Sequence, residues 1–529
     1  MHKHDGRTRG MILPKAWLSA LLATLLVAFV PAVTVTLDGA DAQAQSQTQD
    51  QPVVFTCFIN HTWYPVDSFS GIIPQEITRR IGVALDVTIA KDSRHLNMLL
   101  ASGDLPDLIF SSLQFGTLSD ARYCLDYDGL LAKYNVDWDI SDDLRANALS
   151  FSRDGKVYTV INHYTNTQDW QDTAAVPMTS SLMVRQDMLD AMDNPPLRTL
   201  DDLMAVYLRV RELYPDVMPL TFDMDHRFNV FRVYFGLGLT EFVQQPDGSY
   251  AYYVRDERYR EMLSYLNKLY QNDCLLAENF ATTHGDALYR KGKAFSHTGC
   301  TQNLNLPLET ALRKLDPSYR SVELMPLEGS SYADSQLGWS GVFITTENHD
   351  PQTAIEFVRW MFTPEAQRLT QWGRDGVEYV LTENGLPVFS QAVLDTLENA
   401  TFDRTYNPWF HLGASAIIES EGRCAFLNFP AYSDTYTRIR ELYQNQPWIA
   451  AATPLVGTPE KDVYDRVTDI TLMWETKLIV SESDEVFELN YNEYMRALTA
   501  MNIEALEASV TNSIPTLMEH YSAQSGGAL

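Results

Sequence analysis

The 529-residue sequence is poor in cysteine, and its five cysteines include no CxxC pair. Structural zinc sites and thioredoxin-like redox motifs depend on such closely spaced pairs, so neither is indicated. In an exported protein one disulfide bridge is a candidate, for example Cys274 with Cys300. The odd count leaves at least one thiol over, and the connectivity stays open.

Basic residues are also scarce. The chain has 40 Lys and Arg against 69 Asp and Glu, a net charge of −29. Residues 1–44 carry four basic and three acidic side chains, which leaves a net charge of −30 for the remainder. Such a field repels phosphate backbones and anionic membranes. The composition therefore disfavours nucleic acid as a partner and favours a neutral or cationic ligand.

Long apolar runs are absent after residue 44, so no later segment is expected to span a bilayer. One apolar run covers residues 16–30, after four basic residues and before the small-x-small tripeptide 42–44. This pattern is typical of a secretory signal peptide. We therefore expect removal of residues 1–44, a linker over 45–51, and an exported chain associated with the cell surface. An uncleaved segment that tethers a surface sensor or adhesin stays open as an alternative.

Complete catalytic motifs are missing too. Residues 338–342 (GWSGV) lack the last glycine of a nucleophile elbow, residues 291–294 (KGKA) lack the spacing of a P-loop, and no HExxH occurs. Asp223 and Asp225 could act as the paired carboxylates of a glycoside hydrolase, or hold a metal with His226, although a solvated loop or a pocket wall is the simpler interpretation. We therefore expect no catalytic residue, metal or cofactor, with an exported carbohydrate-active hydrolase as the alternative.

What the sequence does have is a regular alternation near its start. Apolar patterns predict strands over 53–59, 85–89 and 108–110 and helices over 73–81 and 94–101. This β-α-β-α-β order is typical of the α/β class, with a mostly parallel sheet and helices on both faces. Ligands of such sheets bind beyond the carboxyl ends of the strands, which directs attention to the loops 60–69 and 111–116.

Further elements follow along the chain. We expect strands over 157–161 and 182–184 and helices over 200–213 and 259–270. We also expect helix starts capped by Asp350 and Thr363, each followed by proline, and a helical tail clearest over 486–506. The pattern indicates two α/β lobes whose sequences interrupt each other.

Aromatic residues are frequent in the predicted loops, where flat rings with polar neighbours suit the faces of sugars. Packing of each ring into the core is the competing interpretation. Trp63 and Trp339 are the best candidates, because each lies beside a predicted strand end and among turn residues. The residues that we expect in a ligand pocket are Trp63, Ser111, Trp170, Phe228, His297 and Trp339, with Asp225 and His226 as second choices.

Several segments together resemble one protein family. They are residues 102–110 (SGDLPDLIF), 154–161 (DGKVYTVI), 182–192 (LMVRQDMLDAM), 198–212 (RTLDDLMAVYLRVRE) and 361–380 (MFTPEAQRLTQWGRDGVEYV). In this order and spacing they are similar to the extracellular solute-binding proteins of bacterial ABC importers. Within that family they resemble the large branch found as Gram-positive lipoproteins and linked to oligosaccharide uptake. Two departures are the missing lipobox cysteine and the missing proline after Tyr158.

The resemblance implies a two-lobed, periplasmic-binding-protein-like fold of type II, with interleaved lobes and a ligand cleft between them. The first lobe would comprise residues 52–164 and 338–400, and the second residues 165–337 and 401–529. It also implies a monomeric, non-enzymatic receptor. Such a receptor captures a small solute, expected to be an oligosaccharide, by hinge closure and delivers it to ABC permease subunits.

Overall fold

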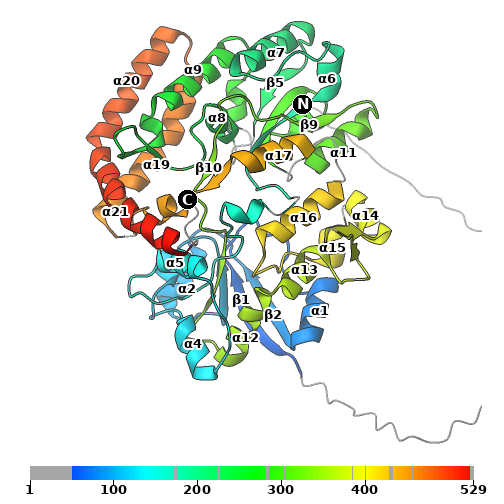
Figure 1. The fold of residues 1–529 in the computed structure, drawn as a ribbon, viewed down its shortest axis with the longest axis vertical. Coiled ribbons are helices and arrows are strands. Elements are labelled where there is room, and N and C mark those ends of the chain that lie inside the picture. The colour runs from blue at the N-terminus through cyan, green and yellow to red at the C-terminus, as the bar shows by residue number, and fades with distance from the viewer. Residues whose placement is uncertain are drawn as a thin grey trace, which may run out of the picture. The chain divides into compact units, whose positions relative to one another are not determined.

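The structure is a computed structural model, which describes residues 51–524 except positions 172, 174, 384, 400 and 456 and segments 223–226, 282–284, 302–304 and 428–432. Its contacts divide the chain into Met1–Asp50 and Gln51–Leu529, and the description below concerns the second unit. That unit holds the expected α/β architecture, with two separate four-stranded sheets (Figure 1). The first and second lobes are named here after these sheets.

The first sheet has the strand order β11-β3-β1-β2. Its first three strands in the sequence run parallel, and β11 runs antiparallel to β3. Side chains alternate between two apolar layers: Phe58 and Ile109 pack with Leu96 on one face, while Ile59 and Phe110 pack on the other. The strands are β1 (Val53–Ile59), β2 (Val83–Ile89), β3 (Leu108–Ser111) and β11 (Gly341–Ile344).

Helices α1 (Ile72–Ile81) and α2 (His95–Ser102) connect these parallel strands. Both end at a glycine in the left-handed region, Gly82 with φ 68° and Gly103 with φ 74°, where other residues are strained. The predicted β-α-β-α-β order is therefore confirmed, with every element end within two residues of its expected position.

The second sheet has the order β5-β8-β4-β9. Strand β5 is parallel to β8, and β4 is antiparallel to both β8 and β9. The carboxyl ends of β5, β8 and β9 therefore lie at the edge where β4 begins. The strand predicted over 182–184 is confirmed within β4. The strands are β4 (Ser180–Arg185), β5 (Met218–Thr221), β8 (Ala294–Cys300) and β9 (Ser321–Glu323).

Three helix starts confirm their sequence signals. Thr199 and Asp202 form a reciprocal capping box at the start of α7 (Leu200–Leu213). The Asp350 side chain caps α12 (Pro351–Met361), and the Thr363 side chain caps α13 (Pro364–Trp372). Each cap accepts a backbone N–H that the first turn of a helix leaves without a partner.

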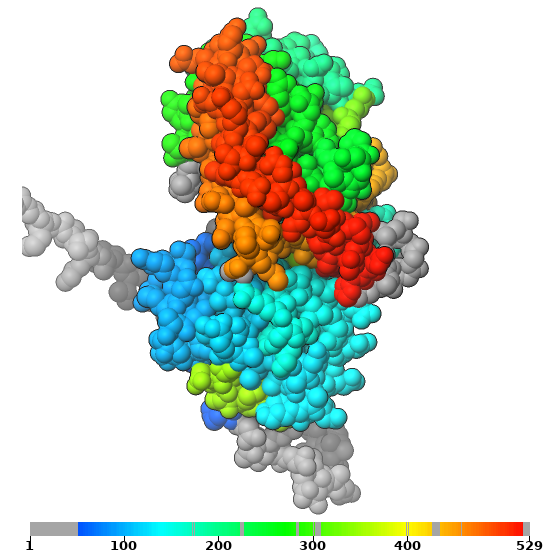
Figure 2. All heavy atoms as spheres, turned by 90° about the vertical axis from the view of Figure 1, so that its left-hand side faces the viewer, coloured from blue at the N-terminus to red at the C-terminus, as the bar shows by residue number. Residues whose placement is uncertain are grey.

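The helix α21 (Ile503–Gln524) joins the two lobes. It packs on α19 (Pro459–Ile479) of the second lobe and reaches α5 (Asp142–Leu149). There the hydroxyl of Tyr521 donates to Oδ1 of Asn147 at 2.8 Å, with both side chains buried. Figure 2 shows this helix in red, crossing the second lobe until it meets the cyan part of the first.

The remaining elements complete the two lobes and link them. The helices are α3 (Phe115–Leu118), α4 (Tyr127–Tyr134), α6 (Gln186–Ala191), α8 (Asn229–Tyr234), α9 (Glu257–Gln271), α10 (Ala287–Arg290), α11 (Asn305–Leu315), α14 (Gln391–Glu398), α15 (Phe402–Tyr406), α16 (Ala416–Leu427), α17 (Ser433–Leu442), α18 (Pro447–Ala451) and α20 (Asp484–Ala500). The two-stranded sheets are β6 (Phe242–Gln244) with β7 (Tyr250–Tyr252), β10 (Tyr332–Asp334) with β14 (Tyr443–Asn445), and β12 (Tyr379–Leu381) with β13 (Pro387–Phe389).

One element prediction is wrong. Residues 157–161 form no strand. The segment is held by single contacts, such as the one from the Thr159 hydroxyl to the carbonyl of Val342, and only Ile161 forms a bridge, with Gly341. The helical tail predicted to be clearest over 486–506 is confirmed, and it consists of two helices, since Asn502 adopts a left-handed φ of 66° between α20 and α21.

The predicted Cys274–Cys300 bridge is also wrong. Cys274 is a buried free thiol in the second core, where burial raises its pKa to about 11. Cys57 and Cys124 are likewise buried free thiols of the first lobe. Thiols in such surroundings stay protonated and unreactive.

The predicted lobe boundaries stay a prediction. Side chains beyond residue 400 pack in the core of the first sheet, including those of Tyr406, Phe410 and Leu412. None of the helices in the described part of the chain is long and apolar enough to cross a membrane.

Candidate functional site

The carboxyl ends of β1 and β3 meet the amino end of β11 at one edge of the first sheet. Ile59 pairs with Phe110, and Ser111 pairs with Gly341, so the residues that follow or precede these positions are neighbours. The amide of Asn60 donates to the Ser111 hydroxyl at 3.0 Å, and that hydroxyl donates to the carbonyl of Leu113 at 2.7 Å. Ser111 is fully buried, and these bonds hold the β3–α3 loop against β1.

Aromatic rings gather at this edge, and we name them the ring cluster: His61, Trp63, Tyr64, His163, Trp339, Trp409 and His411. His61 stacks on Trp339 with ring centroids 5.4 Å apart and planes 15° apart. Trp63 lies 5.2 Å from His61 and 6.1 Å from Trp409. Trp63 is 56% exposed and Trp339 is half-buried, so the cluster presents ring surface to solvent.

Two imidazoles of the cluster, those of His61 and His411, are kept neutral. Burial lowers the pKa of His61 to about 4, and the Ser340 hydroxyl lies 3.3 Å from its Nε2. Burial likewise lowers the pKa of His411 to about 4, although the charge of Glu419 opposes this shift. A neutral imidazole offers one donor and one acceptor, which suits hydroxyl groups.

A charged group borders the ring cluster. Burial alone would raise the pKa of Glu419, but Arg423 and His163 outweigh it and hold this pKa well below its usual value. The carboxylate lies 2.6 Å from Nε2 of His163 and forms an ion pair with Arg423. Glu419 therefore stays ionised and fixes His163 beside Trp339.

The corresponding edge of the second sheet is lined by hydroxyls. Oγ1 of Thr179, Oγ of Ser181 and Oγ1 of Thr298 are buried, and none has a hydrogen-bond partner in the residues that the structure describes. They lie where β4 begins and β8 ends. Buried hydroxyls without partners cost free energy, which marks this edge as a place where further polar groups would be stabilising.

Two predicted site residues of the second lobe are buried in this structure. His297 is fully buried, with Nδ1 3.0 Å from the hydroxyl of Thr221. Phe228 packs between Phe222 and Phe280, with ring centroids 4.9 and 5.9 Å away. Asp223, Asp225 and His226 lie outside the described residues.

Trp170 lies in the core as well. Its indole Nε1 donates to the Thr165 hydroxyl at 3.0 Å, and its ring makes an edge contact with Tyr443. Only 2% of the residue is exposed. The structure thus brings Trp63 and Trp339 together in one cluster and places Trp170 in the core of the second lobe.

Sequence reasoning did not select His61, His163, His411 and Glu419. The sequence could have indicated His61, because it follows the end of β1 by two residues and lies two residues before Trp63. The other three come from segments about 100 to 350 residues away from it. No local pattern indicates such long-range contacts.

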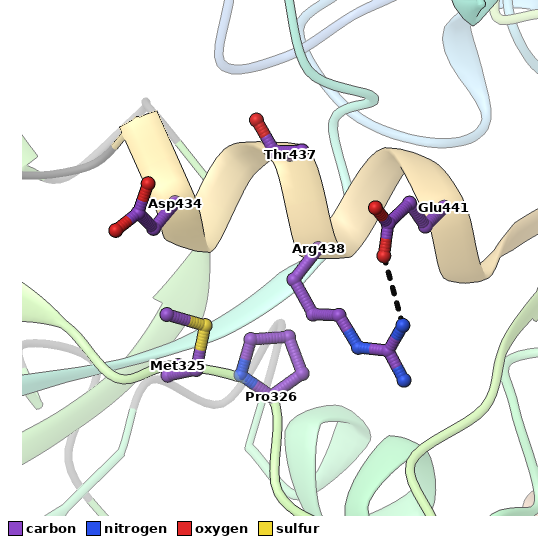
Figure 3. A pocket seen from close by; sticks show the side chains of 6 residues that line it. All are labelled: Met325, Pro326, Asp434, Thr437, Arg438 and Glu441. Carbon is purple, nitrogen blue, oxygen red and sulfur yellow. Dashed lines mark hydrogen bonds and ion pairs between the residues drawn. The ribbon is translucent and has the colours of Figure 1, made fainter.

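Two surface grooves lie apart from the ring cluster. One, of about 390 Å³, is lined by Met325 and Pro326, which follow β9, and by Asp434, Thr437, Arg438 and Glu441 of α17 (Figure 3). Arg438 pairs with Glu441 at 2.8 Å across its wall. The other, of about 500 Å³, lies between β7 and α21 and is lined by Arg255, Glu504 and Glu507 among others. Neither is lined by a predicted site residue.

A metal site is not apparent in the described ranges, where no group of three or more His, Cys, Asp or Glu side chains could hold an ion.

Comparison with known proteins identifies the architecture. No protein-family model and no curated protein matches the sequence. The fold is similar to that of the alginate-binding protein AlgQ2, solved without calcium ion, with a TM-score of 0.65 and 16% identity over 88% of this chain and 98% of that one. It is also similar to an HMO-binding, ABC-transporter-associated solute-binding protein from Bifidobacterium longum infantis, with a TM-score of 0.64 and 9% identity over 89% and 99% of the two chains.

A third likeness is to the S. pneumoniae ABC-transporter substrate-binding protein FusA in complex with kestose. The TM-score is 0.62, with 15% identity over 89% of this chain and 99% of that one. Identities of this size establish shared architecture, not shared ligands. This chain therefore has the two-lobed, type II fold of the solute-binding proteins that serve ABC transporters.

Proposed function

We propose that the chain is an exported, non-enzymatic, monomeric receptor that binds a neutral oligosaccharide between its lobes and delivers it to an ABC permease. The observation that carries this proposal is the ring cluster at the carboxyl edge of the first sheet, with Trp63 exposed and Trp339 half-buried beside it. Ligands of open α/β sheets bind at such edges. The binding partners named for the three similar structures, alginate, HMO and kestose, support a carbohydrate.

The chemistry of the cluster fits sugars better than ions. Indole faces pack on the apolar faces of pyranose rings, and the neutral imidazoles of His61 and His411 exchange hydrogen bonds with hydroxyls. Glu419 is occupied by His163 and Arg423, so the cluster offers a cation or an anion no free countercharge among the described residues. An overall charge of −29 adds repulsion against anions.

Lobe closure would couple binding to delivery. A ligand that touches both lobes binds the closed form more tightly and shifts the population toward it. A shift from 1:99 to 99:1 requires a differential affinity of about 5.5 kcal/mol. Two stacked rings and a few buried hydrogen bonds supply that amount.

Further parts of the proposal concern the chain's organisation. Residues 1–44 would direct export and be removed. The first lobe would comprise 52–164 together with residues from 338 to just past 412, since Phe410 and Leu412 pack in its core. The second lobe would comprise the remainder.

Titration against a small panel tests the function. Glucose, maltotriose, kestose and trialanine are titrated into the protein while tryptophan fluorescence and heat are recorded. We expect saturable binding of an oligosaccharide, with a smaller radius of gyration in solution scattering. Binding of trialanine alone would contradict the sugar, and hydrolysis of the bound oligosaccharide would contradict the receptor.

A further inference from the structure

Three segments meet near the ring cluster. Residues 161–167 and 334–340 run between the lobes, and residues 411–416 lead into α16, which packs on α13 and β13 of the first lobe. Asn162 lies where they meet, and only 1% of it is exposed. Its backbone N–H donates to the carbonyl of Ser340 at 2.8 Å, and its carbonyl accepts the N–H of Trp339 at 2.9 Å. The first and second segments are therefore joined directly at Trp339 and Ser340.

The side chain of Asn162 adds the third segment. Its Nδ2 donates to the carbonyl of Leu412 at 3.0 Å, while its Oδ1 accepts the N–H of Ser340 at 2.9 Å. The amide meets both demands at once, because it donates to a carbonyl through its nitrogen and accepts an N–H through its oxygen. The backbone of His163 extends the same contact by donating to the carbonyl of Ala414 at 2.9 Å.

Two glycines, Gly338 and Gly341, allow the close approach of these segments. A Cβ atom on Gly338 would lie 2.4 Å from the carbonyl oxygen of Asn162, and one on Gly341 would lie 2.3 Å from Oγ1 of Thr159. Gly338 also has a φ of +105°, a conformation that side chains disfavour. Trp339 thus stands between two glycines that leave room for the segment carrying Thr159 and Asn162.

A second asparagine, Asn445, provides a comparison, because it joins the other ends of residues 161–167 and 334–340. Nδ2 of Asn445 donates to the carbonyls of Thr165 at 2.8 Å and Gln336 at 3.0 Å, and its Oδ1 accepts the N–H of Gln336 at 2.9 Å. It is 6% exposed. Asn445 therefore joins the same segments on the side of the second lobe, away from Trp339.

We propose that Asn162 is the positioning residue of the ring cluster. It fixes Trp339 beside His61 and ties it to all three segments, two of which run between the lobes. Its importance for ligand capture rests on the proposed function, but its positioning role does not. A ligand that moves Trp339 would act on both of those connections and on residues 411–416 through this one side chain.

The test compares Asn162→Ala with Asn445→Ala in the full chain without added sugar. Amide hydrogen exchange is followed in peptides covering 338–342, 411–415 and 443–447. Loss of a buried hydrogen bond raises local opening by about tenfold or more. We expect this increase over 338–342 and 411–415 in Asn162→Ala, and over 443–447 in Asn445→Ala.

The Trp339 ring supplies the second readout. Its acrylamide quenching is obtained as the difference between each variant and the same variant carrying Trp339→Phe. We expect stronger quenching in Asn162→Ala and unchanged quenching in Asn445→Ala. Equal effects of the two variants, or none, would overturn the proposal.

A conservative variant covers the case in which Asn162→Ala fails to fold. Asn162→Asp keeps an acceptor for the Ser340 N–H but turns a carboxylate toward the Leu412 carbonyl. Once protonated, that carboxyl donates again, so exchange over 411–415 should slow between about pH 8 and about pH 5, after correction for the wild type. The absence of this recovery would also overturn the proposal. Both measurements stand even if no sugar binds, so the two hypotheses fail separately.

Discussion

The edge of the first sheet is built from rings, whereas the corresponding edge of the second sheet is built from hydroxyls. Trp63 is 56% exposed, while the hydroxyls of Thr179, Ser181 and Thr298 are buried. An exposed ring can meet a sugar face without rearrangement, but a buried hydroxyl must first be uncovered. Under the proposed function, we therefore expect the first lobe to make the initial contact and the second lobe to contribute after movement.

The largest expected effect comes from Gly338→Ala at the first edge. The added Cβ would clash with the Asn162 carbonyl and adopt an unfavourable φ, so we expect the free energy of unfolding to fall by about 3 kcal/mol in urea titration. Gly385→Ala is the matched control, because Gly385 has a φ of +78° and open space around it. It should lose about 1 kcal/mol. Equal losses of unfolding free energy in the two variants would show that the close approach of Gly338 to the Asn162 carbonyl does not affect stability.

Trp63→Ala tests the ring edge itself. Removing an exposed stacking surface should weaken oligosaccharide affinity by about 10- to 100-fold, or about 1.5 to 3 kcal/mol, measured by calorimetry. The stability of the free protein should hardly change. Leu489→Ala, on an equally exposed side chain of α20, is the control and should leave affinity unaltered. Unchanged affinity in Trp63→Ala would remove the first lobe's assigned part in binding.

Thr298→Val tests the hydroxyl edge. Since the hydroxyl has no partner in the described structure, its replacement by a methyl group should raise the free energy of unfolding by about 1 kcal/mol. Thr221→Val is the paired control, because the Thr221 hydroxyl bonds to the carbonyl of Ser296 and to His297. That variant should lose about 1 kcal/mol. A lower free energy of unfolding in both variants would mean that both hydroxyls have hydrogen-bond partners.

The smallest effect concerns pH. The pKa of His411 is lowered to about 4, so below about pH 6.5 the unfolded chain binds a proton that the folded chain refuses. Stability is therefore full above about pH 6.5 and falls as the pH drops toward 4. Replacing this group by His411→Asn should flatten the decline by about 0.5 kcal/mol between pH 7 and pH 6 in urea titrations. A decline as steep as that of the wild type would mean that His411 titrates alike in the folded and unfolded chain, so that its pKa is not lowered by folding.

Local signals predicted the regular elements well. Gly103 and the apolar run 108–110 gave the end of α2 and the buried strand β3, because both depend on neighbouring residues alone. The segment 157–161 is not the strand that its apolar side chains predict. These side chains are buried, but the backbone is irregular and the segment contacts β11 through the Thr159 hydroxyl.

The ring cluster was predicted only in part. Trp63 and Trp339 were selected because each lies beside a strand end, which local pattern reveals. His411 and Glu419 were missed because they reach the cluster from the segment 411–416 and from α16, and nothing in their own surroundings indicates it. Trp170 was chosen for its ring, but its indole N–H is used by Thr165 within the chain.

The two connections between the lobes, residues 161–167 and 334–340, have a consequence for proteolysis. Strand β11 pairs with β3 although more than 200 residues separate them, and the intervening chain builds the second sheet. A single cut in either connection therefore leaves the lobes linked covalently by the other. A nicked molecule would still elute as one particle in gel filtration, while a denaturing gel would resolve it into two fragments.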